Sequence, residues 1–417
     1  MLERFELTKN NSSVTTEFFG GLSSFLASFY IIIVNPAILS QAGMPYNAVC
    51  TSTIMIAAFS TILMGIYANN PIILAPGMGL NAFFTFSIVL GKQIEPEIAL
   101  GIVFWSGILF IIFSMLKMRE KIIALIPVHL RYAVSCGIGL FISFLGFING
   151  KIIIHNPDTL VSMAPISSVS VTFFISLILC AFYLLKGFRA GLVLGILTNL
   201  LLAIPLGRWW GDSTFINWQG FIEYPDFSLF GKMNLVDSFK LSLFPTILAF
   251  MFTNLFDTIS TLVGVSEAGN LLDSNGQPRN LKKSLLVDAV ATTFSGIFGT
   301  SSTTSYIESA AGIQQGARTG LSSVFAGLFF LPFLFLAPLL SMFPIYTTAP
   351  ILVIVGLFML SPITKINWKK MDIALPSFLA LALIPLTFSI TQGLIAAMLC
   401  HYAFWLFRKT GVLKHEK

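Results

Sequence analysis

Charged residues are scarce in this 417-residue chain. Asp, Glu, Lys and Arg make up only 10% of the sequence, whereas hydrophobic residues make up 56%. A soluble globular domain carries roughly 25% charged residues and about 45–50% apolar residues. The composition therefore excludes an ordinary soluble domain and predicts an integral membrane protein whose main partner is the lipid bilayer.

Cysteine and histidine are also rare. The four cysteines fall in separate apolar stretches, at Cys50, Cys136, Cys180 and Cys400. This scatter predicts packed thiols rather than a disulfide framework. The four histidines are equally dispersed, at His129, His155, His401 and His415. No metal-ligand spacing or catalytic triad is present in this pattern, so we expect no enzyme, no metal and no cofactor.

The net charge is positive, +6, but its distribution argues against nucleic acid as a partner. Lys and Arg gather in short tracts between apolar segments, for example at Arg279, Lys282 and Lys283. Such tracts are typical of cytoplasmic loops under the positive-inside rule.

Apolar runs separated by turn residues or charges predict fourteen segments. The first half contains 20–40, 49–68, a half-helix at 81–91, 98–116, 130–149, 169–185 and 190–206. The second half contains 239–264, 284–298, a half-helix at 305–314, 319–340, 348–361, 373–389 and 391–407. We therefore expect an all-α polytopic membrane protein.

The distribution of positive charge predicts that both termini are cytoplasmic. With fourteen crossings, only five of the 24 Lys and Arg residues fall on the outer side: Lys92, Lys151, Arg208, Lys232 and Lys240. Seven segments per half is an odd number, so the halves must insert with opposite orientation as a 7+7 inverted repeat. We expect one repeat over 1–206, an external connection over 207–238 and the second repeat over 239–417.

Two polar breaks interrupt the apolar pattern at matching positions in the two halves. They are the stretches Ala75-Pro76-Gly77-Met78-Gly79-Leu80-Asn81 and Gly299-Thr300-Ser301-Ser302-Thr303-Thr304-Ser305. Irregular backbone at membrane depth is tolerated only where it is buried in protein or lines a cavity. Paired interrupted segments in corresponding positions are the best sequence indication of a transporter's binding site.

Few ionisable residues lie inside the predicted segments, and each is a candidate for function because burying a charge in a membrane is costly. They are Asp257, Glu267, Asp288 and Glu308. If the two breaks meet at mid-membrane, Asp257 and Glu308 would accept hydrogen bonds from a ligand beside the half-helix that Asn81 begins. The alternatives are a structural ion pair or helix cap for the two acids, and plain capping for Asn81.

These groups together describe a site for a flat, neutral heterocycle that displays both donors and acceptors. We add Thr304 and Ser305, from the second break, to the predicted site. Phe83, Phe84 and Phe256 would supply a stacking face. Each of the three is alternatively a packing residue, since the chain holds 41 phenylalanines.

At these positions the sequence resembles the Azg-like purine permeases, a branch of the nucleobase–cation symporters (the nucleobase–ascorbate transporter superfamily). The matching stretches are Asn35-Pro36-Ala37-Ile38-Leu39, Ala75 to Phe84, Phe256-Asp257-Thr258, and Thr303 to Gly312. The resemblance implies a core domain of segments 1–4 and 8–11 and a gate domain of segments 5–7 and 12–14. It also implies that a short extended stretch precedes each half-helix, and that a purine binds between core and gate.

Carried over residue by residue, the resemblance makes Asp257 and Glu308 the substrate-binding carboxylates and Asn81 a further contact. Asp288 becomes a carboxylate that supports coupling, so that Asp257, Glu308 and Asp288 form the proton-coupling set. Uptake in such proteins is driven by protons across the inner or plasma membrane, and relatives suggest a homodimer through the gate. Two positions depart from the family pattern: Ser260 replaces a common Gly, and Asn254 replaces an Asp that many members carry.

Two other classes of function remain open from the sequence. One is an anion transporter or channel of the same architecture, and the other is a membrane scaffold or sensor that moves nothing. The sequence leaves open which purine is preferred and whether protons or sodium ions drive uptake.

Overall fold

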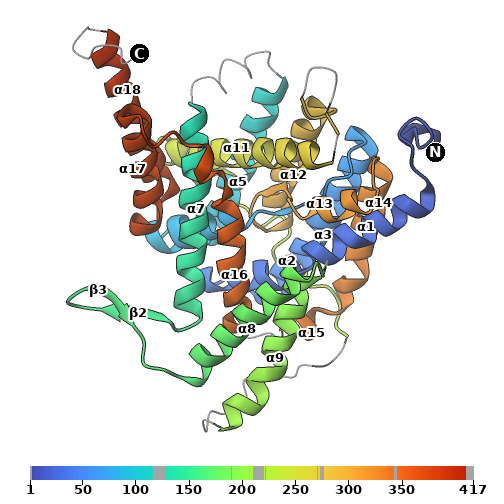
Figure 1. The fold of residues 1–417 in the computed structure, drawn as a ribbon, viewed down its shortest axis with the longest axis horizontal. Helices are drawn as coiled ribbons and strands as arrows, with labels where there is room; N and C mark the ends of the chain where they lie inside the picture. The colour runs from blue at the N-terminus through green and yellow to red at the C-terminus, as the bar shows by residue number, and fades with distance from the viewer. Residues whose placement is uncertain are drawn as a thin grey trace.

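A computed structural model of the chain is almost entirely helical (Figure 1). It describes residues 2–115, 127–188, 190–209, 220, 222–269, 271–272, 277–341 and 345–409. The first-half helices are α1 Val14–Ser28, α2 Ile31–Leu39, α3 Tyr46–Leu63, α4 Met78–Ala82, α5 Pro96–Met115, α7 Val128–Asn149, α8 Ser168–Leu185 and α9 Gly191–Trp209. π-Helical turns extend α3 through Met64–Ala68 and α4 through Phe83–Leu90.

The second half likewise contains both long helices and short, interrupted ones. Its elements are α10 Leu235–Ser238, α11 Phe244–Ala268, α12 Leu281–Phe298, α13 Ser309–Gln314, α14 Gly320–Phe330, α15 Ala337–Ser341, α16 Ile345–Met359, α17 Met371–Thr387 and α18 Ile390–Lys409. A 3-10 turn at Leu331–Phe335 separates α14 from α15, and another at Ser361–Lys365, named η7, follows α16. Each of the fourteen predicted ranges contains at least one helix.

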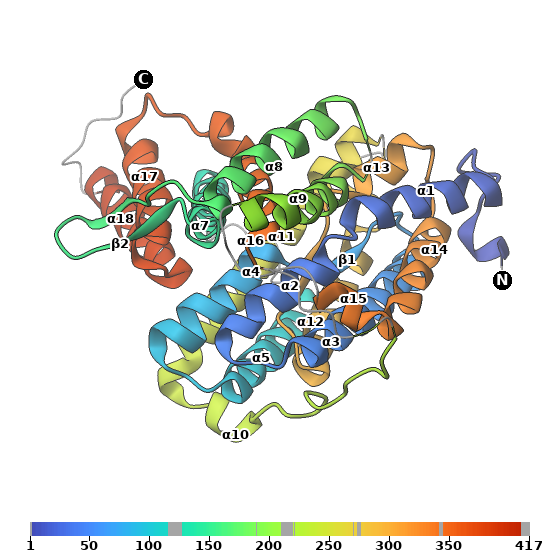
Figure 2. The same cartoon turned by 90° about the horizontal axis from the view of Figure 1, so that it is seen from below.

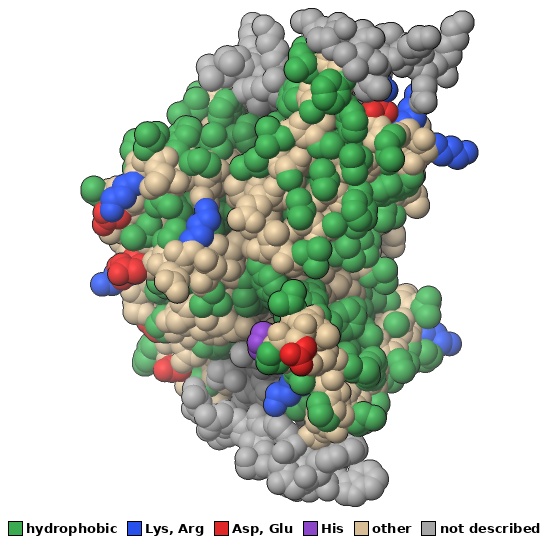
Figure 3. Space-filling model, turned by 90° about the vertical axis from the view of Figure 1, so that its left-hand side faces the viewer, with side chains coloured by type: hydrophobic (Ala, Val, Ile, Leu, Met, Phe, Trp, Pro, Cys, Tyr) green, Lys and Arg blue, Asp and Glu red, His purple; other side chains and the backbone are tan. Residues whose placement is uncertain are grey.

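The distribution of side chains is that of a protein surrounded by lipid. Eight helical stretches of the described chain are long and apolar enough to cross a membrane. Hydrophobic side chains are widespread on the described face in Figure 3, where few charged side chains appear, and Leu185 is 89% exposed. Polar groups such as Asp288 and Asn81 are instead fully buried. This inversion of the soluble pattern is expected where hydrocarbon replaces water outside.

The two breaks lie side by side in the interior, where they form a two-stranded antiparallel sheet. Strand β1, Leu74–Pro76, pairs with β4, Thr303–Ser305, and Ala75 lies opposite Thr304. Figure 2 shows β1 surrounded by helices. Because neither break can satisfy its backbone groups within a helix, each supplies the hydrogen-bond partners of the other.

Both half-helices begin at residues other than those predicted. The first begins at Met78 rather than at residue 81, and the amide of Asn81 already donates to the carbonyl of Gly77 at 2.8 Å. Asn81 therefore does not begin or cap this helix, because its backbone is part of the first turn. The second begins at Ser309 rather than at residue 305, because residues 303–305 form the strand β4.

Other segments were not predicted in the form observed. The range 319–340 is divided into α14, a 3-10 turn and the start of α15. Strands β2, Ile153–Asn156, and β3, Leu160–Met163, form a hairpin that projects from the helices in Figure 1. Each strand of this hairpin has only four residues, too few to stand out as a predicted membrane segment. Much of the connection 207–238 lies outside the described residues, and its described part ends in α10.

Candidate substrate site

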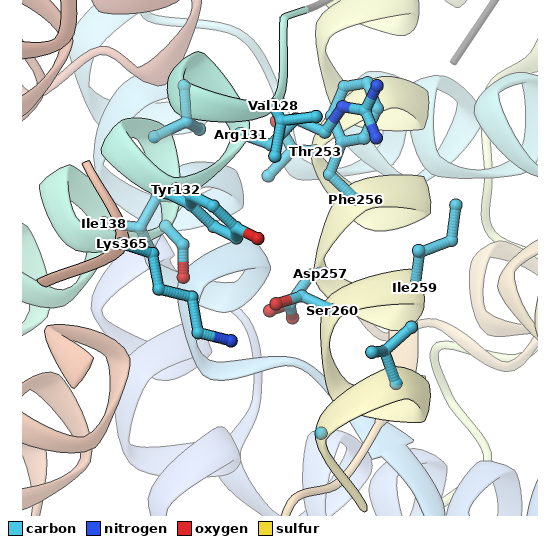
Figure 4. Close-up of a pocket in the computed structure, with 14 residues that line it drawn as sticks. Val128, Arg131, Tyr132, Ile138, Thr253, Phe256, Asp257, Ile259, Ser260 and Lys365 are labelled. Atoms are coloured by element: carbon cyan, nitrogen blue, oxygen red, sulfur yellow. The ribbon is translucent and has the colours of Figure 1, made fainter. Parts of the chain in front are cut away.

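A cavity lies between the paired breaks and the helices α7 and α16. It has two adjoining lobes of about 210 and 180 Å³. Both lobes are lined by Ser135, Asp257, Ser260, Gly264 and Lys365. These residues come from α7, α11 and η7, so the cavity joins elements from both halves of the chain (Figure 4).

The first lobe has an aromatic and cationic wall. The guanidinium of Arg131 lies 5.5 Å from the centre of the Phe256 ring, a cation–π contact. Phe256 in turn stacks on Phe252 with ring centres 6.0 Å apart and planes at 11°. The ammonium of Lys365 lies 5.7 Å from the centre of the Tyr132 ring. Figure 4 shows Tyr132, Lys365 and Asp257 directed into the same space.

The second lobe is lined by the backbone around both breaks. It contains Met78 and Gly79 at the start of α4, and the residues Thr304 to Glu308 that lead into α13. Tyr30, at the junction of α1 and α2, also lines this lobe and donates a hydrogen bond of 2.6 Å to Glu308 Oε1. Glu308 is thereby held at the cavity by a residue from the other half of the chain.

Asp257 is positioned by the second break. The hydroxyl of Thr304, in β4, donates to Asp257 Oδ2 at 3.0 Å. The same hydroxyl lies 3.2 Å from the hydroxyl of Thr258, which donates to Asp288 Oδ2 at 2.6 Å. Thr303 donates a longer bond, 3.4 Å, to Asp288 Oδ1. Two buried hydroxyls therefore connect the carboxyl groups of Asp257 and Asp288.

The structure brings several of the predicted site residues together and leaves others apart. Asp257, Thr304, Ser305 and Glu308 line the second lobe, and Phe256 lines the first. Asp288 lies behind this wall, joined to it through Thr258. The predicted role of each residue in binding remains a prediction.

Asn81, Phe83 and Phe84 are fully buried and are not among the residues that line either lobe. The Asn81 side chain accepts a hydrogen bond from the hydroxyl of Ser301 and so links the two breaks. The Phe83 ring stacks on Phe250, with ring centres 5.3 Å apart. In this geometry the three residues support the site from behind, and their contact with a ligand stays a prediction.

Sequence reasoning missed Tyr30, Arg131, Tyr132, Thr258 and Lys365. Tyr30 and Thr258 lie inside predicted segments, where one polar hydroxyl among many carries no separate signal. Arg131 and Lys365 were counted as ordinary cytoplasmic charges. For Thr258, its place directly after Asp257 within the Phe256-Asp257-Thr258 stretch was the only available signal.

Comparison with known proteins assigns the chain to a family. The sequence model of the permease family matches residues 15–398. The chain belongs to this family. It is 39% identical over 402 residues to the adenine permease AdeP of Escherichia coli (strain K12), covering 94% of this chain and 88% of that protein. It is also 39% identical over 404 residues to the guanine/hypoxanthine permease PbuG of Bacillus subtilis (strain 168), covering 94% and 90%.

The fold is also found in a solved transporter structure. The transmembrane domain of the cyanobacterial bicarbonate transporter BicA superposes with a TM-score of 0.67, covering 92% of this chain and 97% of that domain. The two sequences are only 18% identical, so this likeness concerns the fold alone. This permease is therefore a multi-pass membrane protein with the architecture of that transporter class.

Proposed function

We propose that this permease is a secondary active transporter that imports a purine nucleobase, guanine/hypoxanthine or adenine, across the cell membrane. One observation carries the proposal: Asp257 and Glu308 line the second lobe of the cavity together with Lys365. The adjoining first lobe bears Arg131 and Tyr132. The names of the relatives AdeP and PbuG support a purine as the substrate.

The charges around the cavity favour a neutral guest with two different edges. Carboxylates accept hydrogen bonds only, whereas Lys and Arg donate only. An anion would be repelled by Asp257 and Glu308, and a cation by Arg131 and Lys365. A neutral purine displays N–H donors and ring or carbonyl acceptors, so it matches both walls at once. Phe256 would contribute a stacking face.

We further propose that protons drive uptake, with no other cofactor. The hydroxyls of Thr304 and Thr258 each carry one proton, and both protons are used when the two hydroxyls donate to Asp257 and Asp288. Protonating Asp257 would reverse one of these bonds and let Thr304 donate to Thr258 instead. The chain of hydroxyls thus couples the protonation of the cavity carboxylate to Asp288.

Transport would proceed by an elevator-like movement of a core against a gate. The proposed core holds segments 1–4 and 8–11 of a fourteen-segment 7+7 inverted repeat, and the gate holds segments 5–7 and 12–14. The cavity supports this division, because its acidic wall belongs to the proposed core and its basic wall to α7 and η7 of the gate. The first lobe extends to Val128, the first residue of α7, which the positive-inside rule places on the cytoplasmic side.

Localisation and assembly complete the proposal. Both termini would be cytoplasmic, as the distribution of Lys and Arg favours, and two copies would associate through their gate domains.

The alternative function is anion transport, because BicA, which has the same fold, is named as a bicarbonate transporter. Two acids in one cavity disfavour it, because each raises the electrostatic cost of an anion there.

Uptake of labelled purine by reconstituted vesicles tests the proposal. Asp257→Asn and Glu308→Gln should each remove uptake while the protein still inserts and keeps its melting temperature in detergent. The matched controls are Asp226→Asn and Glu223→Gln, whose side chains lie outside the cavity, and they should transport normally. Normal uptake by both cavity variants, or bicarbonate flux without purine flux, would refute the assignment.

A further inference from the structure

Lys365 is the one lysine among those of the α16–α17 connection that lines the cavity. Lys365, Lys369 and Lys370 are all exposed, but Lys369 and Lys370 are absent from the lining of both described lobes. Lys365 lines both lobes, and Figure 4 shows its ammonium group directed toward the space in front of Asp257. Lys365 therefore differs from these two lysines in lining the cavity in front of Asp257, and not in its exposure.

The backbone that carries Lys365 is held in place. The turn η7 ends at Lys365, and the indole Nε1 of Trp368 donates to the carbonyl of Ile363 in the same turn at 3.1 Å. The thiol of Cys136, on α7, contacts the carbonyl of Leu360 just before the turn at 3.7 Å. Lys365 therefore enters the cavity from a fixed point on the wall opposite α11.

We infer that Lys365 binds the substrate directly and gives the cavity its preference for 6-oxopurines, by donating to the carbonyl oxygen at C6. This inference rests on the purine-transport function proposed above. An ammonium group has three donors and no acceptor. It can pair with the C6 carbonyl of hypoxanthine or guanine, whereas the C6 amino group of adenine presents only donors to it.

The residues on the two walls make this arrangement complementary to such a base. With Lys365 at the C6 carbonyl, the N–H groups of the base remain for the carboxylates, which need donors. Asp257 accepts from Thr304 through Oδ2, and no hydrogen bond to its other oxygen is found among the described residues, although Asp257 lines both lobes. Relatives named for adenine and for guanine/hypoxanthine are equally identical to this chain, at 39%, so overall identity does not decide the preference.

The test compares the affinities of hypoxanthine and adenine in one preparation. Competition against labelled purine uptake in vesicles gives the ratio of inhibition constants for the two bases. Lys365→Met keeps an unbranched side chain only one atom shorter and removes its donors. It should weaken the binding of hypoxanthine by about tenfold or more relative to that of adenine. Lys365→Arg keeps donors and should retain most of the preference, and Lys369→Met should leave the ratio at the wild-type value.

The possible outcomes test the role of Lys365 separately from the proposed transport of purines. A ratio that Lys365→Met leaves unchanged, or that Lys369→Met lowers as much, overturns the role of Lys365 even where uptake persists. A wild-type protein that takes up neither base refutes the proposed function instead. Thermal melting of each purified variant in detergent shows whether a lost signal comes from unfolding. For a variant that transports too slowly, the shifts in melting temperature caused by hypoxanthine and by adenine give the ratio of the two affinities instead.

Discussion

The two breaks occupy equivalent positions but contribute different chemistry. The first, around β1, is rich in Gly and apolar residues, and it offers backbone and close packing: a Cβ added at Gly77 would lie 2.7 Å from Thr304 Cγ2. The second, around β4, is rich in hydroxyls and leads into Glu308. An inverted repeat thus gives two similar backbones on which one half supplies shape and the other supplies polar side chains.

The largest effect should come from the polar break. Thr304→Val keeps the shape of the side chain but removes the hydroxyl that donates to Asp257 Oδ2. A hydrogen bond to a charged group is worth about 1.5–3 kcal/mol, so purine affinity should fall roughly tenfold to hundredfold. The measurement is the KM of uptake together with its dependence on the proton gradient.

Thr293→Val is the matched control, because among the described residues the hydroxyl of Thr293 donates to the carbonyl of Ala289 in its own helix, away from the acids. It should leave both KM and proton dependence near wild type. An unchanged KM in Thr304→Val would mean that Asp257 does not need this hydroxyl for binding or coupling.

A somewhat smaller effect is expected at the contact that positions Glu308. Tyr30→Phe removes the hydroxyl that donates to Glu308 Oε1 at 2.6 Å, and uptake should fall by about tenfold. Tyr46→Phe is the comparison, since Tyr46 lines neither described lobe and its hydroxyl donates to the backbone carbonyl of Leu340 at 2.8 Å rather than to an acid. Its removal should lower the melting temperature and change KM little. Equal kinetic effects from the two variants would contradict a special role for Tyr30.

The sequence was sufficient to predict the membrane class, the approximate positions of the helices and the presence of two breaks. These depend on long apolar runs and on Gly, Pro and hydroxyl clusters, which are local signals. The pairing of β1 with β4 was implied only by the expectation that the breaks meet, because no local pattern fixes a three-residue register. The four-residue strands of the hairpin β2–β3 are too short to stand out as a predicted membrane segment, and the hairpin was missed.

The acidic residues of the candidate site could be predicted from the sequence, whereas its basic residues could not. Asp257, Asp288 and Glu308 were recognisable because a carboxylate inside an apolar run is rare. Lys365 and Arg131 lie near predicted segment ends, where positive charge is common, and only the three-dimensional structure shows that they line the cavity. Phe83 and Asn81 were predicted as site residues from the first break, but they are buried and line neither described lobe, so their contact with a ligand stays a prediction.

A third prediction tests the role of close packing in the first break. Gly77→Ala places a Cβ against the Thr304 methyl group, and overpacking of this kind costs about 1–3 kcal/mol. The melting temperature and the uptake rate should both fall. Thr304→Ser removes that methyl group and keeps the hydroxyl, so the double variant should recover much of both. No recovery would show that another neighbour of Gly77, such as Leu80, limits the packing.

The smallest kinetic effect should come from Asn81, and it decides whether this residue joins the breaks or binds the substrate. The structure pairs its side-chain oxygen with the hydroxyl of Ser301 and leaves its Nδ2 without a partner among the described groups. Asn81→Ala and Ser301→Ala should therefore each lower stability by about 1 kcal/mol.

Because the two residues share one hydrogen bond, the double variant should be about as stable as either single variant. The KM for purine should change less than about threefold in all three, since removing a hydrogen bond to the substrate would raise KM further. A rise in KM of about tenfold in Asn81→Ala, without a similar rise in Ser301→Ala, would instead place the Asn81 amide against the substrate. In that case the first break would supply a polar side chain to the cavity as well as shape, and the division between the two halves would not hold.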